Sequence, residues 1–206
     1  MKKLIVLSIT AAISLPAYAD HNMVDGMDFG PLAQLVGTWE SSPSGGVDMS
    51  PAQEGTEQGK GAPAVTPFYE VMTFEVAADA TNASDQYLVA LYYKQEVFRK
   101  SDDSKFHDQR GYLIYDQENQ KVYNSFCVPR TTCVTAEGDA GNNMVLKASK
   151  RGIAESEYMT DNAKTTDFTM NLKIEDGSLT YSQTSSLEIY GSAFAHTDTS
   201  TLVKVK

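Results

Sequence analysis

Few side chains in this sequence have the types and spacing that covalent catalysis needs. The chain has no Gly-x-Ser-x-Gly, no His-Glu-x-x-His and no P-loop sequence. Its two cysteines are too few for a four-cysteine zinc or iron–sulfur site. The remaining candidates are groups suited to binding, and they are His21, His107, His196, Arg110 and Arg130.

The histidines differ in their sequence surroundings. His196 lies two residues before Asp198 in a strand-like segment, His107 follows Phe106 in another such segment, and His21 lies in a polar stretch. Neutral imidazole is a good metal ligand when an acceptor holds its other ring nitrogen. For His196, the competing interpretation is a solvent-facing strand position beside Asp198. We assign no role to His21.

Composition limits the class of protein. The 206 residues include 17 Lys plus Arg and 27 Asp plus Glu, which gives a net charge of -10. This length suits one ordinary domain. A phosphate-binding surface needs positive charge, so we expect no nucleic-acid partner.

The N-terminus has the order of a secretory signal peptide over residues 1–19. Lys2 and Lys3 precede a largely apolar stretch over residues 4–15, and an Ala-x-Ala pattern stands immediately before Asp20. The apolar stretch is too short for a comfortable membrane span, and no later segment is long and apolar enough to make one. We therefore expect a periplasmic or secreted product with no membrane span.

Export would place both cysteines in an oxidising compartment. Cys127 and Cys133 flank residues 128–132, which are typical of a turn between two strands. We expect a disulfide that closes this hairpin, and two separate buried thiols are the alternative.

The pattern after residue 67 is almost wholly that of β-strands. Apolar residues alternate cleanly along residues 168–174, and an Asp-Gly hairpin signal follows. Residues 68–76 alternate in the same way, with Glu70 as the exception on the apolar face. The expected strands lie near residues 68–76, 86–98, 106–115, 121–128, 132–136, 144–149, 168–174, 179–181, 187–189 and 201–205.

The N-terminal part of the mature chain is less regular. Residues 20–29 predict a flexible arm, and residues 30–36 predict one or two helical turns. Residues 41–66 are rich in Ser, Gly, Pro and Glu without a hydrophobic period, which predicts a long loop insertion. The expected fold is all-β, a single antiparallel up-and-down barrel of about ten strands over residues 30–206. Such a barrel has room for one small ligand.

Several segments resemble known small-ligand barrels. Residues 31–40, with the sequence Gly37-Thr38-Trp39, resemble the opening of calycin-type barrels, which implies that the short helical turn closes one end of the barrel. Residues 66–75 and 106–112 together resemble the nitrobindin-like haem-binding β-barrel family, which is grouped with fatty-acid-binding-protein-like proteins. Residues 195–202 resemble the last strand of that family, where a histidine binds the haem iron.

The resemblance implies a barrel that binds one apolar small molecule, with haem b as the first candidate, and the signal peptide implies that this barrel is exported. It makes His196 the axial iron ligand and gives His107 a structural or pocket-rim role. Arg110 or Arg130 could bind a haem propionate, since arginine binds carboxylates with two hydrogen bonds. Trp39 would pack at the closed end or contact the ligand.

Haem with an open sixth position would further imply nitric oxide or peroxynitrite chemistry. The alternatives are a metal-free lipid or fatty-acid carrier and a structural or interaction protein whose barrel is filled by side chains.

Overall fold

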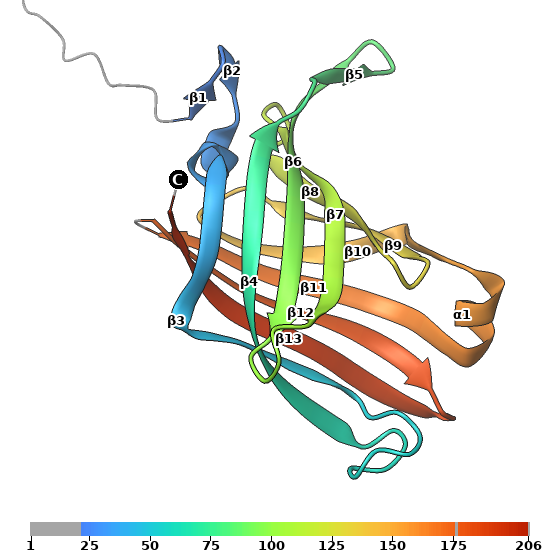
Figure 1. Cartoon of the computed structure of the whole chain (residues 1–206). Helices are drawn as coiled ribbons and strands as arrows, with labels where there is room; N and C mark the ends of the chain where they lie inside the picture. The colour runs from blue at the N-terminus through green and yellow to red at the C-terminus, as the bar shows by residue number, and fades with distance from the viewer. Residues whose placement is uncertain (1–21, 176, 206) are drawn as a thin grey trace, which may run out of the picture.

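The computed structural model describes residues 22–175 and 177–205, which form a closed antiparallel β-barrel (Figure 1). The expected signal peptide, its cleavage site and His21 lie outside the described residues. Within the described ranges, no helix is long and apolar enough to cross a membrane.

Ten strands make the barrel wall. They are β3 (Gly37–Pro51), β4 (Pro63–Val76), β6 (Gln86–Arg99), β7 (Lys105–Asp116), β8 (Lys121–Val128), β9 (Thr132–Asp139), β10 (Asn143–Glu155), β11 (Ala163–Glu175), β12 (Ser178–Ile189) and β13 (Ser192–Lys204). Each strand pairs with its neighbours in antiparallel register, and the β13–β3 and β4–β6 pairings close the wall. Closure leaves no unpaired edge along the wall. The expected all-β barrel of about ten strands is therefore confirmed.

Smaller elements surround the barrel. The extra strand β5 (Ala80–Asn82) pairs with β6, and β1 (Met23–Val24) pairs with β2 (Met27–Asp28). The arm expected over residues 20–29 thus contains a two-stranded hairpin. Helix α1 (Glu157–Asn162), which the sequence pattern did not reveal, buries one side chain, Met159. A single buried residue produces no helical period, so the sequence carried only a weak signal for it.

The 3-10 helix η1 (Gly30–Leu35) closes one end of the barrel, as the helical-turn prediction expected. Its residues Leu32 and Leu35 are fully buried. Gly30 has a positive φ of 52°, and a Cβ at this position would collide with the ring of Tyr115. Glycine therefore allows the chain to lie directly on that aromatic ring.

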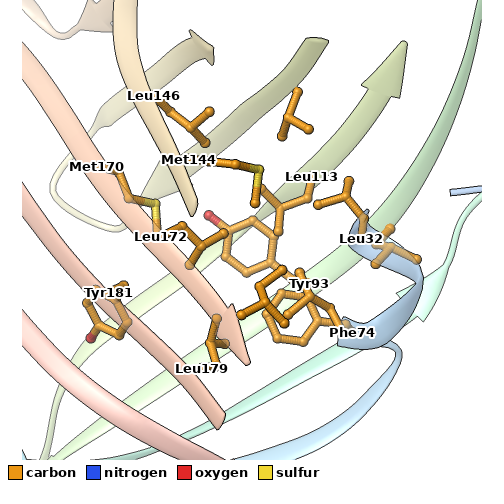
Figure 2. Close-up of a cluster of buried hydrophobic side chains, with 14 of the residues drawn as sticks. Leu32, Phe74, Tyr93, Leu113, Met144, Leu146, Met170, Leu172, Leu179 and Tyr181 are labelled. Atoms are coloured by element: carbon orange, nitrogen blue, oxygen red, sulfur yellow. The ribbon is translucent and has the colours of Figure 1, made fainter. Parts of the chain in front are cut away.

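An apolar core fills the half of the barrel beneath η1. Phe74 and Tyr93 stack with their ring centroids 5.8 Å apart, and Met144 and Leu172 face them from the opposite wall (Figure 2). Trp39 is 1% exposed and donates a hydrogen bond from Nε1 to the carbonyl oxygen of Leu35 at 2.7 Å. This bond joins η1 to the first wall strand.

The expected long loop over residues 41–66 is wrong in extent, because strands occupy most of it. β3 runs on to Pro51 and β4 begins at Pro63, so that residues 52–62 connect the two strands. The buried residues on this part of β3 are Gly46 and Asp48, and a Cβ on Gly46 would collide with the ring of Phe68. A strand whose inner positions are glycine and aspartate has no hydrophobic alternation, which is why its pattern looked like a loop.

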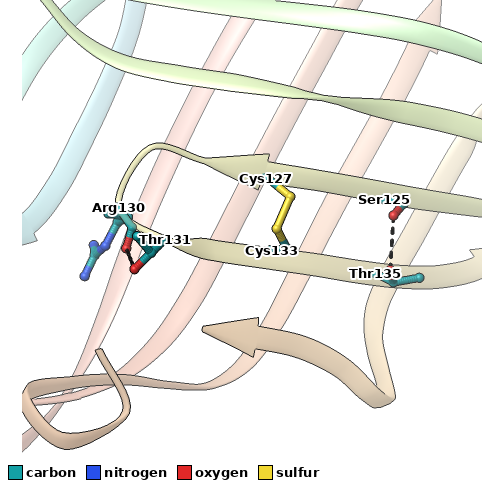
Figure 3. Close-up of a disulfide and its surroundings, with 6 residues drawn as sticks. All are labelled: Ser125, Cys127, Arg130, Thr131, Cys133 and Thr135. Atoms are coloured by element: carbon teal, nitrogen blue, oxygen red, sulfur yellow. Dashed lines mark hydrogen bonds between the residues drawn. A yellow bond between two sulfur atoms is a disulfide. The ribbon is translucent and has the colours of Figure 1, made fainter. Parts of the chain in front are cut away.

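The two cysteines are joined, as the hairpin interpretation expected. Cys127 on β8 lies directly opposite Cys133 on β9, with the Cα atoms 4.0 Å apart, and the pair forms a disulfide (Figure 3). Two residues further along the same ladder, Ser125 Oγ and Thr135 Oγ1 are hydrogen-bonded at 3.2 Å. The disulfide therefore fixes the base of the turn that carries Arg130.

Candidate ligand-binding cavity

A cavity of about 380 Å³ lies at the end of the barrel opposite η1. Its volume is within the range of small-molecule sites. Apolar walls come from Phe68, Val97, Phe106 and Ile189, and polar groups come from Asp48, Ser50, Gln95, His107, Arg130, Tyr181, Gln183, His196 and Asp198. The polar groups outnumber the apolar ones, in contrast to the core beneath η1.

His196 lies on the cavity side of β13. Its Nε2 is 2.6 Å from Oδ1 of Asp48 and 3.7 Å from Oδ1 of Asp198. Asp198 is directly opposite Asp48 in the β13–β3 ladder, and His196 shares its strand face with Asp198 because it lies two residues away. The solvent-facing interpretation of His196 therefore does not hold, since 80% of its side chain is covered.

Burial and the two carboxylates set the electrostatics of this cluster. Burial raises the pKa of Asp198 to about 7, and the neighbouring Asp48 carboxylate acts in the same direction. Burial also opposes the charged form of His196, but the hydrogen bond to Asp48 and the charges of both aspartates raise its pKa above the ordinary value. For Asp48, the opposing burial is outweighed by hydrogen bonds from His196 and other partners, which lower its pKa.

Two further side chains orient the aspartates. Ser50 Oγ donates to Oδ2 of Asp48 at 2.9 Å, and Gln183 Nε2 donates to Oδ2 of Asp198 at 3.1 Å. Each carboxylate therefore has its Oδ2 held by a neighbour and its Oδ1 turned toward the imidazole of His196.

His107 lines the same cavity from β7. Its Nε2 is buried and has no hydrogen-bond partner among the described residues. Burial lowers the pKa of His107, and the charge of the nearby His196 adds to that effect. A buried nitrogen without a partner is costly, and a bound ligand could satisfy it.

A buried network of polar side chains lies between the cavity and the core. Gln95 Nε2 donates to Oε2 of Glu70 at 2.6 Å, and the Tyr181 hydroxyl donates to the same carboxyl group at 3.1 Å. Glu70 is 1% exposed, and burial raises its pKa. In the sequence, the only sign of this network was Glu70, the acidic residue on the apolar face of residues 68–76.

Two of the expected ligand contacts lie elsewhere. Trp39 does not line the cavity but belongs to the core beneath η1, in agreement with the closed-end interpretation. Arg110 points to the outer face of β7, where its Nη2 is 2.7 Å from Asp108 and 3.4 Å from Glu96. Strand alternation explains this position, because His107 and Gln109 on the same strand point inward. Arg130 is the arginine that reaches the cavity.

Sequence reasoning missed Asp48 because it lay in the presumed loop. It also missed Gln95 and Gln183, since polar residues on an inner strand face look like outward-facing positions until the register is known. The pairing of Asp198 with His196 was visible in the sequence, but only the β13–β3 ladder brings Asp48 to them.

Known proteins were then compared with the chain. No curated protein matches it. Among solved structures, the crystal structure of Rv2717c from M. tuberculosis is similar, with a TM-score of 0.59 and 16% sequence identity over 85% of this chain and 95% of that chain. This likeness shows the fold alone.

The family comparison is more specific. Residues 28–204 match the THAP4-like, heme-binding beta-barrel domain, so that the match includes the whole barrel wall and both cavity histidines. The chain therefore belongs to this family of nitrobindin-like haem-binding β-barrels.

Proposed function

We propose that this chain binds one small molecule in the cavity, that the molecule is haem b, and that His196 is its single axial ligand. Membership of a haem-binding barrel family supports the class of ligand. The observation that carries the proposal is the position of His196, whose ring lines the cavity while Asp48 holds its Nε2 at 2.6 Å.

The residues of the cavity fit this group. Metal-binding imidazoles hydrogen-bond through their other ring nitrogen, commonly to a carboxylate. Asp48 provides such a partner at Nε2 of His196, and the other ring nitrogen would bind the iron. Phe68 and Phe106 offer apolar surface to a flat macrocycle, and Arg130 is the cavity arginine that could bind a propionate. Haem would supply an iron centre able to bind a diatomic ligand such as nitric oxide.

The lining argues against a metal-free fatty-acid carrier. The apolar part of the lining could cover an acyl chain, but two carboxylates and two imidazoles would then be buried against a ligand that offers them no partner. A barrel filled throughout by side chains is also less favoured, because the filled region is the half beneath η1.

Haem titration of the purified mature chain tests the proposal. We expect a Soret band that saturates at one equivalent for the wild type, and a shifted band with at least tenfold weaker affinity for His196→Ala. His107→Ala is the matched control, because it removes the other cavity histidine. Circular dichroism shows whether each variant is folded.

Three outcomes would contradict parts of this proposal. No Soret band with the wild type rejects haem as the ligand. Identical titrations for the wild type and His196→Ala reject His196 as the ligand. A loss seen with His107→Ala alone assigns the iron to His107, whose Nε2 lacks a partner within the described ranges.

We also propose that the chain is exported and cleaved before Asp20. The disulfide between Cys127 and Cys133 supports an oxidising compartment. N-terminal sequencing of periplasmic material should return Asp20 as the first residue, and a first residue of Met1 would contradict the proposal.

A further inference from the structure

We propose that Asp48, His196 and Asp198 form a binding site for a divalent metal cation, with Zn²⁺ as the expected occupant, in the protein that holds no haem. The site uses Nε2 of His196, whereas the proposed haem ligation uses Nδ1, so this inference does not depend on haem binding. One imidazole and two carboxylates are a donor set that zinc accepts.

The geometry is close to what such a cation needs. One ligand atom from each of the three residues lies within 4.8 Å of the other two. Zinc bonds of about 2.1 Å in a tetrahedral arrangement separate the ligand atoms by roughly 3.4 Å. The Nε2 distance to Asp198 is 3.7 Å, and the 2.6 Å distance to Asp48 must widen by less than about 1 Å as the metal replaces the shared proton.

The surrounding groups hold the donors in place. Ser50 and Gln183 donate to the Oδ2 atoms of the two aspartates, so that each Oδ1 remains directed at Nε2. Hydrogen bonds from outside the ligand set orient carboxylates in this way at established metal sites. Both donors line the same cavity as the three ligands, which leaves a side of the site open to water or a small anion.

Charge gives an independent reason for a cation here. Among the described residues, neither Asp48 nor Asp198 forms an ion pair with a lysine or arginine, although both line the cavity and most of each side chain is covered. Asp108 on the outer face, by contrast, is paired with Lys105 and Arg110. A bound metal displaces the protons of this cluster, and the two carboxylates with a neutral imidazole then carry a charge of −2, which one divalent cation neutralises. His107 Nε2, buried nearby without a partner in the described chain, could bind a water or anion on the metal's open side.

Calorimetric titration of the haem-free, metal-stripped mature chain with ZnCl₂ tests this site. The protein should carry no histidine tag. We expect one equivalent of Zn²⁺ for the wild type and at least tenfold weaker binding for Asp198→Asn. Asp108→Asn, an aspartate on the outer face, is the control and should bind as the wild type does. With Co²⁺ as a probe, the wild type should show a visible absorption band that Asp198→Asn lacks.

The outcomes separate this inference from the haem proposal. Wild-type protein that binds no Zn²⁺ overturns it, as do equal affinities for the wild type and Asp198→Asn. Zinc binding without a Soret band on haem addition keeps the metal site and rejects haem. A Soret band without zinc binding keeps the haem proposal and rejects the metal site. Circular dichroism of Asp198→Asn excludes unfolding as the cause of a loss.

Discussion

The two halves of this barrel share one wall but have different interiors. Beneath η1 the interior is packed with apolar side chains, among them Leu91, Leu146 and Leu179, all of which are fully buried. At the opposite end the same strands present Asp48 and His196 to a cavity. Burying charged groups is costly, and packed apolar surface provides the stabilisation that offsets this cost. One half of the barrel therefore stabilises the fold, so that the other half can carry binding groups.

A layer of amides and hydroxyls marks the change between the halves. Gln109 Nε2 donates to the Tyr93 hydroxyl at 2.7 Å, and that hydroxyl donates to Asn124 at 3.0 Å. With the Glu70 network, these bonds satisfy polar groups that neither the core nor the solvent could satisfy. The layer therefore lets a dry core adjoin a polar cavity within one short barrel.

The largest expected effect tests whether the filled half dominates stability. Trp39→Ala removes the largest fully buried side chain and should lower the free energy of unfolding by about 3–5 kcal/mol. Tyr158→Ala is the control, because that aromatic side chain is 73% exposed and should cost less than about 0.5 kcal/mol. Urea unfolding followed by circular dichroism measures both. Similar losses for the two variants would refute the comparison.

A smaller effect is expected at the cavity end. Replacing Cys127 and Cys133 by alanine opens a short covalent loop and should lower the free energy of unfolding by about 2 kcal/mol, with the barrel still folded. Ser125→Ala with Thr135→Ala removes the neighbouring cross-strand pair and should cost about 1 kcal/mol or less. Unfolding of the double cysteine variant under native conditions would show that this hairpin, and not the core, stabilises the fold.

Glu70, in the polar layer, should make the free energy of unfolding depend on pH. Burial raises the pKa of Glu70, so the folded protein keeps this proton after the unfolded chain has lost it at a pKa of about 4.3. The contribution of Glu70 to stability is therefore present at lower pH and is lost as pH rises through its folded pKa. Glu70→Gln should gain stability relative to the wild type as pH increases. Urea unfolding at pH 5 and pH 8 measures this gain.

The exposed Glu75 on the same strand provides the control for that experiment. Glu75→Gln should follow the wild type at both pH values. A constant difference between Glu70→Gln and the wild type across the range would contradict the assignment of this buried acid.

The smallest expected effect is a difference in haem affinity between variants of Arg130, which lines the cavity, and Arg110, which lies on the outer face. Arg130→Ala should weaken haem binding several-fold if haem occupies the cavity, because a rim charge would be lost. Arg110→Ala should leave haem affinity unchanged and alter the free energy of unfolding by less than about 1 kcal/mol, since its ion pairs are on the outer face. Absorbance titration distinguishes them, and equal effects would contradict the cavity position of Arg130.

Much of the filled half could be predicted from the sequence, and much of the cavity half could not. The hydrophobic alternation along β11 and β12 correctly predicts that Leu172 and Tyr181 point inward. It succeeds there because the inward residues of these strands pack in an apolar core. The same rule failed at Asp48, whose inward position carries a polar side chain. A hydrophobic pattern reports only apolar burial, so strand segments that line a polar cavity look like loops.

The site residues show the same limit. Residue type and position predicted the disulfide between Cys127 and Cys133, and the family resemblance pointed to His196, which lines the cavity. Arg110 was placed at the ligand because its side-chain face could not be known before the strand register. The partner Asp48 is 148 residues from His196, and only barrel closure brings the two together.

The disulfide at the β8–β9 turn affects entropy as well as stability. The turn holds Arg130 at the cavity, and Thr131 Oγ1 donates to Ser156 Oγ at 2.8 Å, which ties the turn to the start of α1. A rim that is already ordered loses little conformational freedom when a ligand binds. Reduction of Cys127 and Cys133 would return that freedom to the empty state and weaken binding, although the contact residues stay the same. If a ligand occupies the cavity, its retention would then depend on whether Cys127 and Cys133 are oxidised.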